Sequence, residues 1–220
     1  MLDLDAAHGR LSPPVWRDPA LEVLQQRGLE HEAAYLDQLR ELGLTVVEIT
    51  VDGDESAFDA TVATMRDGAD VIVQATLASD KWFGRADILR RVPIASELGA
   101  WSYEVIDTKL ARETRAGTIL QLCLYSDIVG EVQGLLPECM HVVAPGTNFE
   151  AESFRVNDYL AYYRLVKQRL ADTVAGGAGA SQPTYPDPVP QCEVCRWWSS
   201  CDRRRRDDDL QLDIFMRPQC

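Results

Sequence analysis

The chain has 220 residues, of which 46% are apolar and 26% charged, and this composition suits one well-filled core. It has no run of about 18 apolar residues and no basic-then-apolar leader, so we expect a cytoplasmic protein without a membrane span. The net charge of −13 argues against a generally nucleic-acid-binding surface, although a local arginine cluster or a bound cation could still hold a phosphate backbone.

Apolar periodicity and turn residues predict an alternation of helices and strands along the first 174 residues. Asp18 followed by Pro19 is typical of a helix start, and Gly28 is a candidate break within that helix. The expected helices are 18–43, 55–66, 112–130 and 157–174, and the expected strands are 44–51, 71–77, 82–92, 101–109, 140–144 and 149–156. This order predicts an α/β or α+β fold with a sheet flanked by helices.

The residues after this region differ in kind. Residues 175–190 combine glycine and alanine with four prolines, which predicts an irregular linker. We therefore divide the chain into a core over 1–174, a linker over 175–190, and a C-terminal appendage over 191–220 that holds four cysteines and a run of arginines.

The stretch from Tyr103 to Lys109 ends an apolar strand with a carboxylate and an ammonium. Strand alternation turns Asp107 and Lys109 to the same face. Such a pair suits metal-assisted phosphodiester cleavage: the carboxylate holds the cation, and the lysine orients or deprotonates the attacking water or neutralises charge on the phosphate. A surface ion pair is the plainer interpretation. The chain has only three lysines, however, which favours a chemical reason for this one.

The preceding strand contains a second carboxylate, Asp87, in otherwise apolar surroundings. Gly84, three residues earlier, would let another group approach the strand closely. Carboxylates from neighbouring strands, here Asp87 and Asp107, would form a hard oxygen site for Mg²⁺ or Mn²⁺. The alternative is an aspartate at the turn end of an edge strand.

Three further polar residues are candidates for the same site. His31 is a candidate third metal ligand that would favour Mn²⁺, with Glu32 behind it, although a lone helical histidine is more often a bystander. Gln121 and Tyr125 lie four residues apart and so share one helix face. Contact with substrate or a hydrogen bond in the core would each explain polar groups in that apolar helix.

Taken in order, these residues form a series of motifs. Gly-x-x-His ends at His31, Gly-x-x-Asp at Asp87, Val-Ile-Asp-x-Lys at Lys109, and Gln-x-x-x-Tyr at Tyr125. The series resembles the successive motifs of RecB-like PD-(D/E)xK nucleases over residues 28–125. The resemblance implies a restriction-endonuclease-like fold, in which helices flank a mixed central sheet.

The same resemblance assigns roles to the candidate residues. The metal ligands would be His31, Asp87 and Asp107, and the catalytic residues would be Asp87, Asp107, Lys109, Gln121 and Tyr125. The metal would be Mg²⁺ or Mn²⁺, and Gln121 and Tyr125 would support the active site and the DNA.

Three of the six cysteines, Cys192, Cys195 and Cys201, form a tight cluster. By spacing alone, Zn²⁺ is the simpler ion for these cysteines to bind. Both Zn²⁺ and iron–sulfur clusters need a fourth protein ligand. Several RecB-like nucleases, of the AddB and CRISPR-associated exonuclease types, resemble this C-terminal pattern. They hold a [4Fe–4S] cluster with a fourth cysteine near the N-terminus, so the resemblance favours [4Fe–4S].

No cysteine precedes Gly28 in this chain. The opening residues resemble the stretch that follows the family's N-terminal cysteine, so we expect a truncated start and the loss of the fourth ligand. The candidates to replace it are Cys123, Cys139 and Cys220, although Cys123 fits better as a small core residue.

The sequence thus predicts a metal-dependent DNA nuclease, of an exonuclease or repair type, acting on single- or double-stranded DNA with a helicase or another repair protein as partner. Two alternatives remain open. One is a truncated RecB-like module that binds DNA or a protein without cutting. The other is a zinc-stapled interaction domain in which Asp-x-Lys is accidental.

Overall fold

The chain divides into two units in the computed structural model, which describes residues 2–15, 19–111, 113–176 and 187–215. One unit spans Ala20–Val166, and the other combines Met1–Pro19 with Lys167–Cys220. The first residues are thereby grouped with the C-terminal part, whereas the sequence division grouped them with the core. All the candidate nuclease residues lie in the Ala20–Val166 unit.

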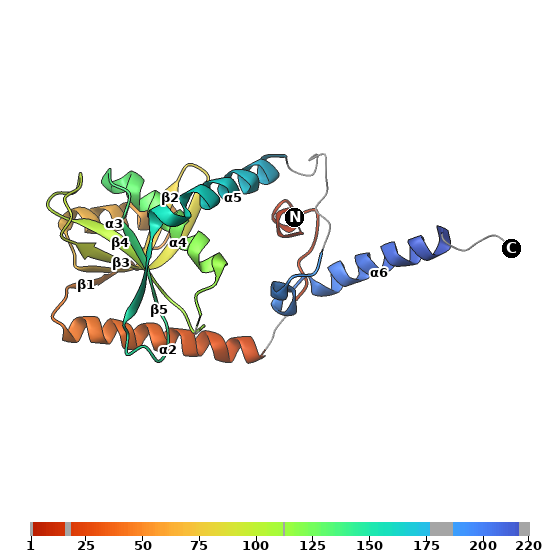
Figure 1. The fold of residues 1–220 in the computed structure, drawn as a ribbon, viewed down its shortest axis with the longest axis horizontal. Coiled ribbons are helices and arrows are strands. Elements are labelled where there is room, and N and C mark those ends of the chain that lie inside the picture. Colours follow the sequence, from red (N-terminus) through yellow and green to blue (C-terminus); the bar gives the residue numbers. More distant parts are fainter. Residues whose placement is uncertain (1, 16–18, 112, 177–186, 216–220) are drawn as a thin grey trace. The chain divides into compact units, whose positions relative to one another are not determined.

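The Ala20–Val166 unit is built on a six-stranded mixed sheet in which the strands follow one another in sequence order (Figure 1). β1 pairs with β2 and β4 with β5 in parallel, and the other neighbours are antiparallel. The strands are β1 (Val46–Glu48), β2 (Val71–Ser79), β3 (Trp82–Val92), β4 (Ser102–Thr108), β5 (Cys139–Val143) and β6 (Ala151–Arg155). The prediction of a mixed sheet flanked by helices is confirmed.

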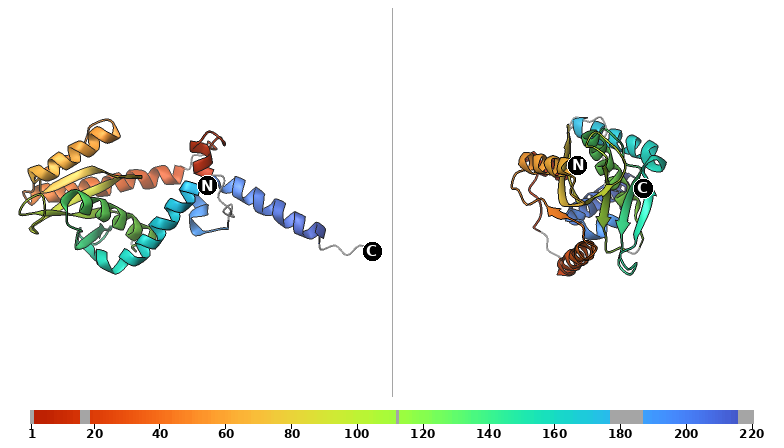
Figure 2. Two further views of the ribbon diagram at one scale, coloured as in Figure 1. Left: turned by 90° about the horizontal axis from the view of Figure 1, so that it is seen from above. Right: turned by 90° about the vertical axis from the view of Figure 1, so that its left-hand side faces the viewer.

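Helices cover both faces of this sheet, as the two views of Figure 2 also show. On one face α2 (Pro19–Glu41) packs Tyr35, Leu36 and Leu39 against buried side chains of β2, β3 and β4. On the other face lies the larger core, to which α3 (Asp54–Asp67), α4 (Ala116–Gln133) and the start of α5 (Val156–Gly176) contribute. The central strands are therefore buried on both sides.

β4 is the most enclosed strand, with six of its seven residues buried. At its start, the side chain of Gln133 accepts a hydrogen bond from the backbone N–H of Tyr103 (2.8 Å) and donates one to the Tyr103 carbonyl (3.2 Å). The Tyr103 hydroxyl donates to the carbonyl of Ala69 at 2.7 Å. These bonds satisfy polar groups that burial would otherwise penalise, and they fix the strand that carries Asp107.

Several boundaries differ from the sequence prediction. α2 continues through Gly28 without a break, because packing against the sheet outweighs the modest helix penalty of one glycine. α4 begins at Ala116 rather than near 112, so a loop separates β4 from α4. β1 has only three residues, paired on one side with β2.

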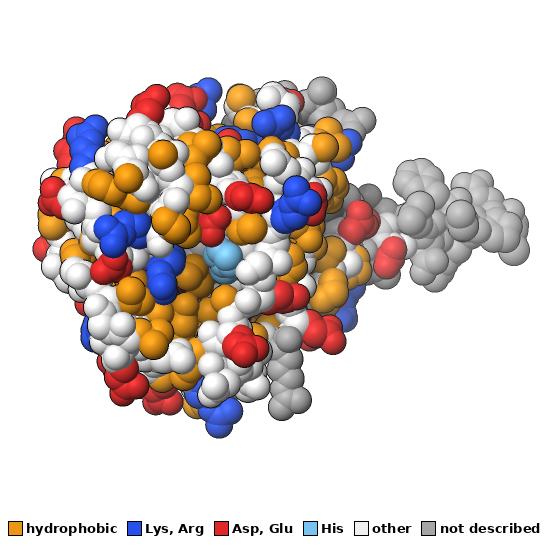
Figure 3. All heavy atoms as spheres, turned by 60° about the vertical axis from the view of Figure 1, so that its left-hand side comes forward, with side chains coloured by type: hydrophobic (Ala, Val, Ile, Leu, Met, Phe, Trp, Pro, Cys, Tyr) orange, Lys and Arg blue, Asp and Glu red, His pale blue; other side chains and the backbone are white. Residues whose placement is uncertain are grey.

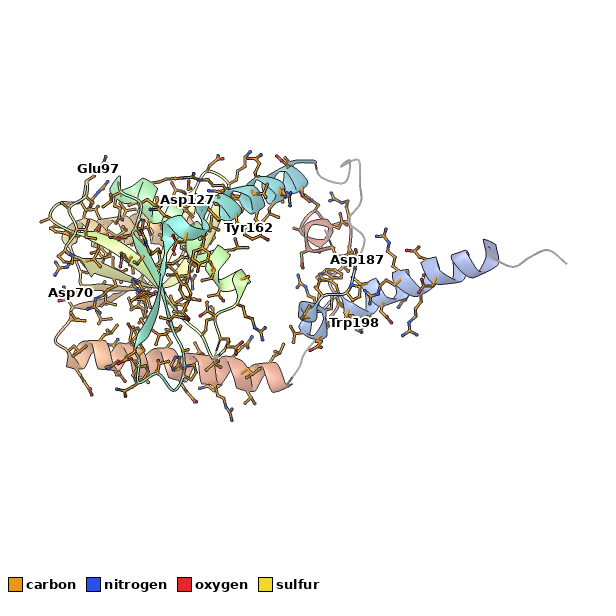
Figure 4. All side chains as sticks on the ribbon, viewed as in Figure 1. Asp70, Glu97, Asp127, Tyr162, Asp187 and Trp198 are labelled. Carbon is orange, nitrogen blue, oxygen red and sulfur yellow. The ribbon has the colours of Figure 1, made fainter. Side chains whose placement is uncertain are left out.

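The second unit contains helices that the sequence analysis did not predict: α1 (Leu2–Ala7) and α6 (Trp198–Phe215), together with the 3-10 helix η2 (Pro190–Val194). α6 lacks a clear apolar stripe and instead forms ion pairs along its surface, such as Arg206 with Asp202 at 2.9 Å. Trp198, which Figure 4 labels, is the first residue of α6, and the guanidinium of Arg205 lies over its ring, 4.8 Å from the centroid.

Within this unit, α1 contacts Arg196 and Trp197, which follow Cys195, through the carboxylate of Asp3. Asp3 accepts a hydrogen bond of 2.9 Å from the indole of the buried Trp197 and forms an ion pair with Arg196. The hydrogen bond from Arg196 lowers the pKa of Asp3, and the Trp197 bond adds to that effect. In the parts of the chain that the structure describes, no helix combines the length and the apolar character that crossing a membrane requires.

Candidate active site

Two aspartates lie side by side at one end of the central strands. β3 and β4 pair antiparallel with Ile88 opposite Ile106, so Asp87 and Asp107 are the next residues on the two strands. The Asp87 carboxylate accepts hydrogen bonds from the backbone N–H (3.0 Å) and the hydroxyl (3.2 Å) of Thr108. The prediction of two carboxylates on neighbouring strands is confirmed.

Asp107 is nearly sealed from solvent, with 2% of its surface exposed. The Nζ of Lys109 lies 2.9 Å from each carboxylate oxygen, so the two side chains share a face as strand alternation predicted. It donates a hydrogen bond to Oδ1, whereas the buried Oδ2 accepts none from any described group. Burial, and then the charge and hydrogen bonding of Asp87, raise the pKa of Asp107 to about 7, against the opposing effect of Lys109.

Lys109 stays protonated in this setting. Burial lowers the pKa of its ammonium, but the hydrogen bond and charge of Asp107, together with the charge of Asp87, outweigh burial and raise it above the usual value. In the protein without a cation, Lys109 therefore acts as a fixed positive charge and hydrogen-bond donor rather than as a base.

A cavity of about 430 Å³ opens beside this pair and brings in a residue of α2. Its lining includes Asp87, Thr108 and Lys109 from the strand ends and Glu32 and Gly28 from α2. Glu32 is half-buried, and burial followed by the charge of Asp87 raises its pKa. The sequence analysis gave Glu32 a supporting role only. Glu32 nevertheless lines the same cavity as Asp87, whereas His31 does not.

The orientation of Glu32 depends on a strained residue in β2. Gln74 donates a 2.8 Å hydrogen bond to Glu32 and has a left-handed backbone, with φ of 54°. It lies between the ladder pairs Val73–Ile88 and Ala75–Ala86, at the level of Asp87 on β3. Such a conformation costs a non-glycine residue about 1 kcal/mol or more and often occurs at functional sites. Nothing in the local sequence indicates it.

His31 lies apart from the two aspartates. Its Nε2 is 3.2 Å from the carbonyl oxygen of Val143, and its ring stacks on Phe149 with centroids 5.7 Å apart. It lines a different cavity, of about 430 Å³, next to the loop that follows β5. The same Val143 carbonyl accepts the backbone N–H of Lys109 at 3.1 Å, so His31 adjoins the end of β4 through the main chain.

Gln121 and Tyr125 form the expected pair on α4, with the Gln121 amide donating to the Tyr125 hydroxyl at 3.0 Å. Tyr125 is buried, and its ring fills the space that Gly84 leaves open on β3. A Cβ at position 84 would lie 2.5 Å from the Tyr125 ring. The close approach that Gly84 permits is therefore made by a side chain of the protein itself.

The predicted metal and cluster ligands are not assembled in full. Among the described residues, no group of three or more histidine, cysteine, aspartate or glutamate side chains is arranged to hold a metal ion. Cys192 and Cys195 lie at η2 and Cys201 in the first turn of α6, while Cys139 is half-buried in β5 and Cys123 is buried in α4. Cys220 falls outside the described residues. The cluster therefore stays a prediction.

Comparison with protein-family models found no match to this chain, and comparison with curated proteins found none either. The resemblance to RecB-like nucleases accordingly rests on the motif series in the sequence.

The contact between Gly84 and Tyr125 generates a stability prediction. Gly84→Ala should lower the free energy of unfolding by about 1–3 kcal/mol, because the Tyr125 ring must shift within a packed core. Gly117→Ala is the matched control, since its added Cβ meets nothing within 4 Å and should stabilise α4 by about 0.5–1 kcal/mol. Urea unfolding of both variants measures the difference, and equal stability for the two would contradict the contact.

The buried aspartate generates a pH prediction for the metal-free protein. Because the pKa of Asp107 is raised in the fold, its contribution to stability is present below about pH 4 and is lost as pH rises through about 7. Asp107→Asn should therefore raise Tm at pH 8, on the order of 5 °C, and flatten the fall in Tm between pH 5 and 8. Thermal unfolding in EDTA measures this, with the exposed Asp59→Asn as control. An unchanged pH slope would show that Asp107 ionises normally.

Proposed function

We propose that the chain is a metal-dependent DNA nuclease of the RecB-like PD-(D/E)xK type, which hydrolyses phosphodiester bonds in an exonuclease or repair role. One observation carries this proposal: a buried carboxylate with an oxygen that accepts no hydrogen bond lies against a second carboxylate and a protonated lysine. Two carboxylates beside one ammonium group in a buried setting leave negative charge uncompensated, and a divalent cation would neutralise it.

The two aspartates fit a hard cation. Asp87 and Asp107 would hold Mg²⁺ or Mn²⁺ through carboxylate oxygens. The Oδ2 of Asp107 is buried and accepts no hydrogen bond, and the Lys109 ammonium lies 2.9 Å from it as an ion-pair partner. Lewis-acid activation of the phosphate and of the attacking water is the chemistry that such a cation supplies when bound. His31 remains a third ligand by resemblance alone, and Glu32 lines the same cavity as Asp87.

The other residues have supporting tasks in this mechanism. Lys109, held 2.9 Å from Asp107, would orient the phosphate or water and neutralise charge that develops on the phosphate oxygens. Thr108 orients the Asp87 carboxylate through two hydrogen bonds. Tyr125 is buried beside Gly84 and fixes the position of Gln121, whose amide lies at the exposed end of the pair.

The charge of the surface is consistent with locally confined contacts to DNA. On the face that Figure 3 draws, acidic and basic side chains are interspersed with hydrophobic ones. With 35 acidic and 22 basic residues in the chain, binding would depend on a few well-placed cations rather than on a general positive field.

The decisive experiment is the cleavage of end-labelled single- and double-stranded DNA with Mn²⁺. Lys109→Ala should lower kcat by at least 100-fold, because the variant loses a charge that acts on the transition state. Lys81→Ala is the matched control, since Lys81 is an exposed lysine at the turn between β2 and β3. Equal activity of wild type and Lys109→Ala would overturn the mechanism.

The second candidate function is a module that binds DNA or a protein partner without cutting. One observation favours it: among the described residues, no three potential metal ligands are assembled into one group. Folded wild-type protein that leaves both DNA substrates intact while still binding them would support it.

Metal binding separates the two functions further. Calorimetric titration with Mn²⁺ should show one site in the wild type, and Asp107→Asn should weaken it at least tenfold, since half of the carboxylate pair is lost. If His31 is a ligand, His31→Ala should weaken binding to a similar degree. If it only bonds the Val143 carbonyl, binding should stay within about threefold. A wild type that binds no Mn²⁺ would exclude metal-dependent cleavage.

A further inference from the structure

A third cavity also has Lys109 in its lining. It measures about 450 Å³ and is enclosed by α2, the loop after β4, the start of α4 and β5. Lys109 lines both this cavity and the one that contains Asp87. A ligand that extended from one cavity into the other would therefore pass directly over the lysine.

The walls of this third cavity have two chemical characters. Leu24, Leu110 and Val142 present apolar surface, whereas Arg115 and Lys109 present positive charge. Thr118 adds a hydroxyl. Apolar surface beside cationic groups and a hydroxyl suits a nucleotide, which combines a base and sugar with a phosphate.

Arg115 has the features of a phosphate-binding residue. Its side chain is exposed, and in the described part of the chain no carboxylate pairs with it. It occupies the N-cap position of the 18-residue helix α4, where no side-chain cap hydrogen bond is formed. Glu113 is the one acid among the lining residues, and the neighbouring Thr114 is held at the rim by a 2.8 Å hydrogen bond to Glu152.

We propose that this cavity binds the nucleotide adjoining the scissile phosphate, with Arg115 as ligand of its phosphate and the apolar wall against its base or sugar. The inference rests on the proposed nuclease function and adds a substrate-positioning site to it. Arg115 would act mainly in binding, because the acid pair and Lys109, rather than Arg115, surround the position of the reacting phosphate.

Substitution of Arg115 tests this site. Arg115→Ala should raise KM for a single-stranded oligonucleotide about tenfold and leave kcat within about twofold. It should also reduce the slope of log affinity against log salt by about 0.7–1, as expected for the loss of one phosphate contact. Arg115→Lys should recover most of the affinity. Arg66→Ala is the matched control, because Arg66 is an exposed arginine near the opposite end of β4 from Lys109.

A binding measurement separates this inference from the nuclease proposal. Thymidine 3′,5′-bisphosphate, titrated in Ca²⁺, should bind the wild type and Arg66→Ala equally and Arg115→Ala about tenfold more weakly. If the wild type cleaves DNA but Arg115→Ala matches it in KM, salt slope and bisphosphate binding, the subsite is overturned and the nuclease stands. If no DNA is cleaved, the nuclease proposal fails. In that case, loss of bisphosphate binding in Arg115→Ala still supports the subsite, and equal or absent binding overturns it.

Discussion

The candidate site depends on two carboxylates that the fold holds side by side, one buried and one half-buried. Asp87 and Asp107 belong to adjacent antiparallel strands, and the fold around them leaves 2% of the Asp107 surface exposed. Burial, and then the like charge of Asp87, raise the pKa of Asp107 despite the nearby ammonium of Lys109, and a proton or a cation would relieve this repulsion. The two strands therefore form a site that a bound proton or cation would stabilise.

The remainder of the Ala20–Val166 unit fixes these two strands. Helices on both faces bury β4, and Gln133 takes over the hydrogen bonds of the Tyr103 backbone at the far end of that strand. At the near end, Thr108 orients Asp87, and Tyr125 packs against β3 where Gly84 omits a side chain. Polar positions around the acids are thus determined by packing and by backbone bonds, and little freedom remains for the carboxylates to move apart.

Local patterns in the sequence were sufficient to predict much of this arrangement. Alternation along 101–109 gave the shared face of Asp107 and Lys109, and helical spacing gave the contact of Gln121 with Tyr125. These predictions succeeded because each depends on the period of a single element. A sheet flanked by helices also followed from the order of the predicted elements, whereas its mixed strand directions were an expectation from the family resemblance.

Features that depend on several elements were not predictable in this way. The left-handed backbone of Gln74 arises where β2 meets β3, and the orientation of Glu32 and His31 depends on how α2 crosses the sheet. Motif order alone placed His31 with the aspartates, yet its ring bonds the end of β5. α6 was missed because its stretch of arginines and aspartates has no apolar period to signal a helix.

The carbonyl oxygen of Val143 accepts two hydrogen bonds, one from His31 on α2 and one from the main chain of Lys109. This single atom connects α2, which packs on one face of the sheet, to the main chain of the lysine at the site. Because α2 also supplies Gly28 and Glu32 to the cavity beside Asp87, the same helix contacts the site on its acid side and at the strand end that carries the lysine.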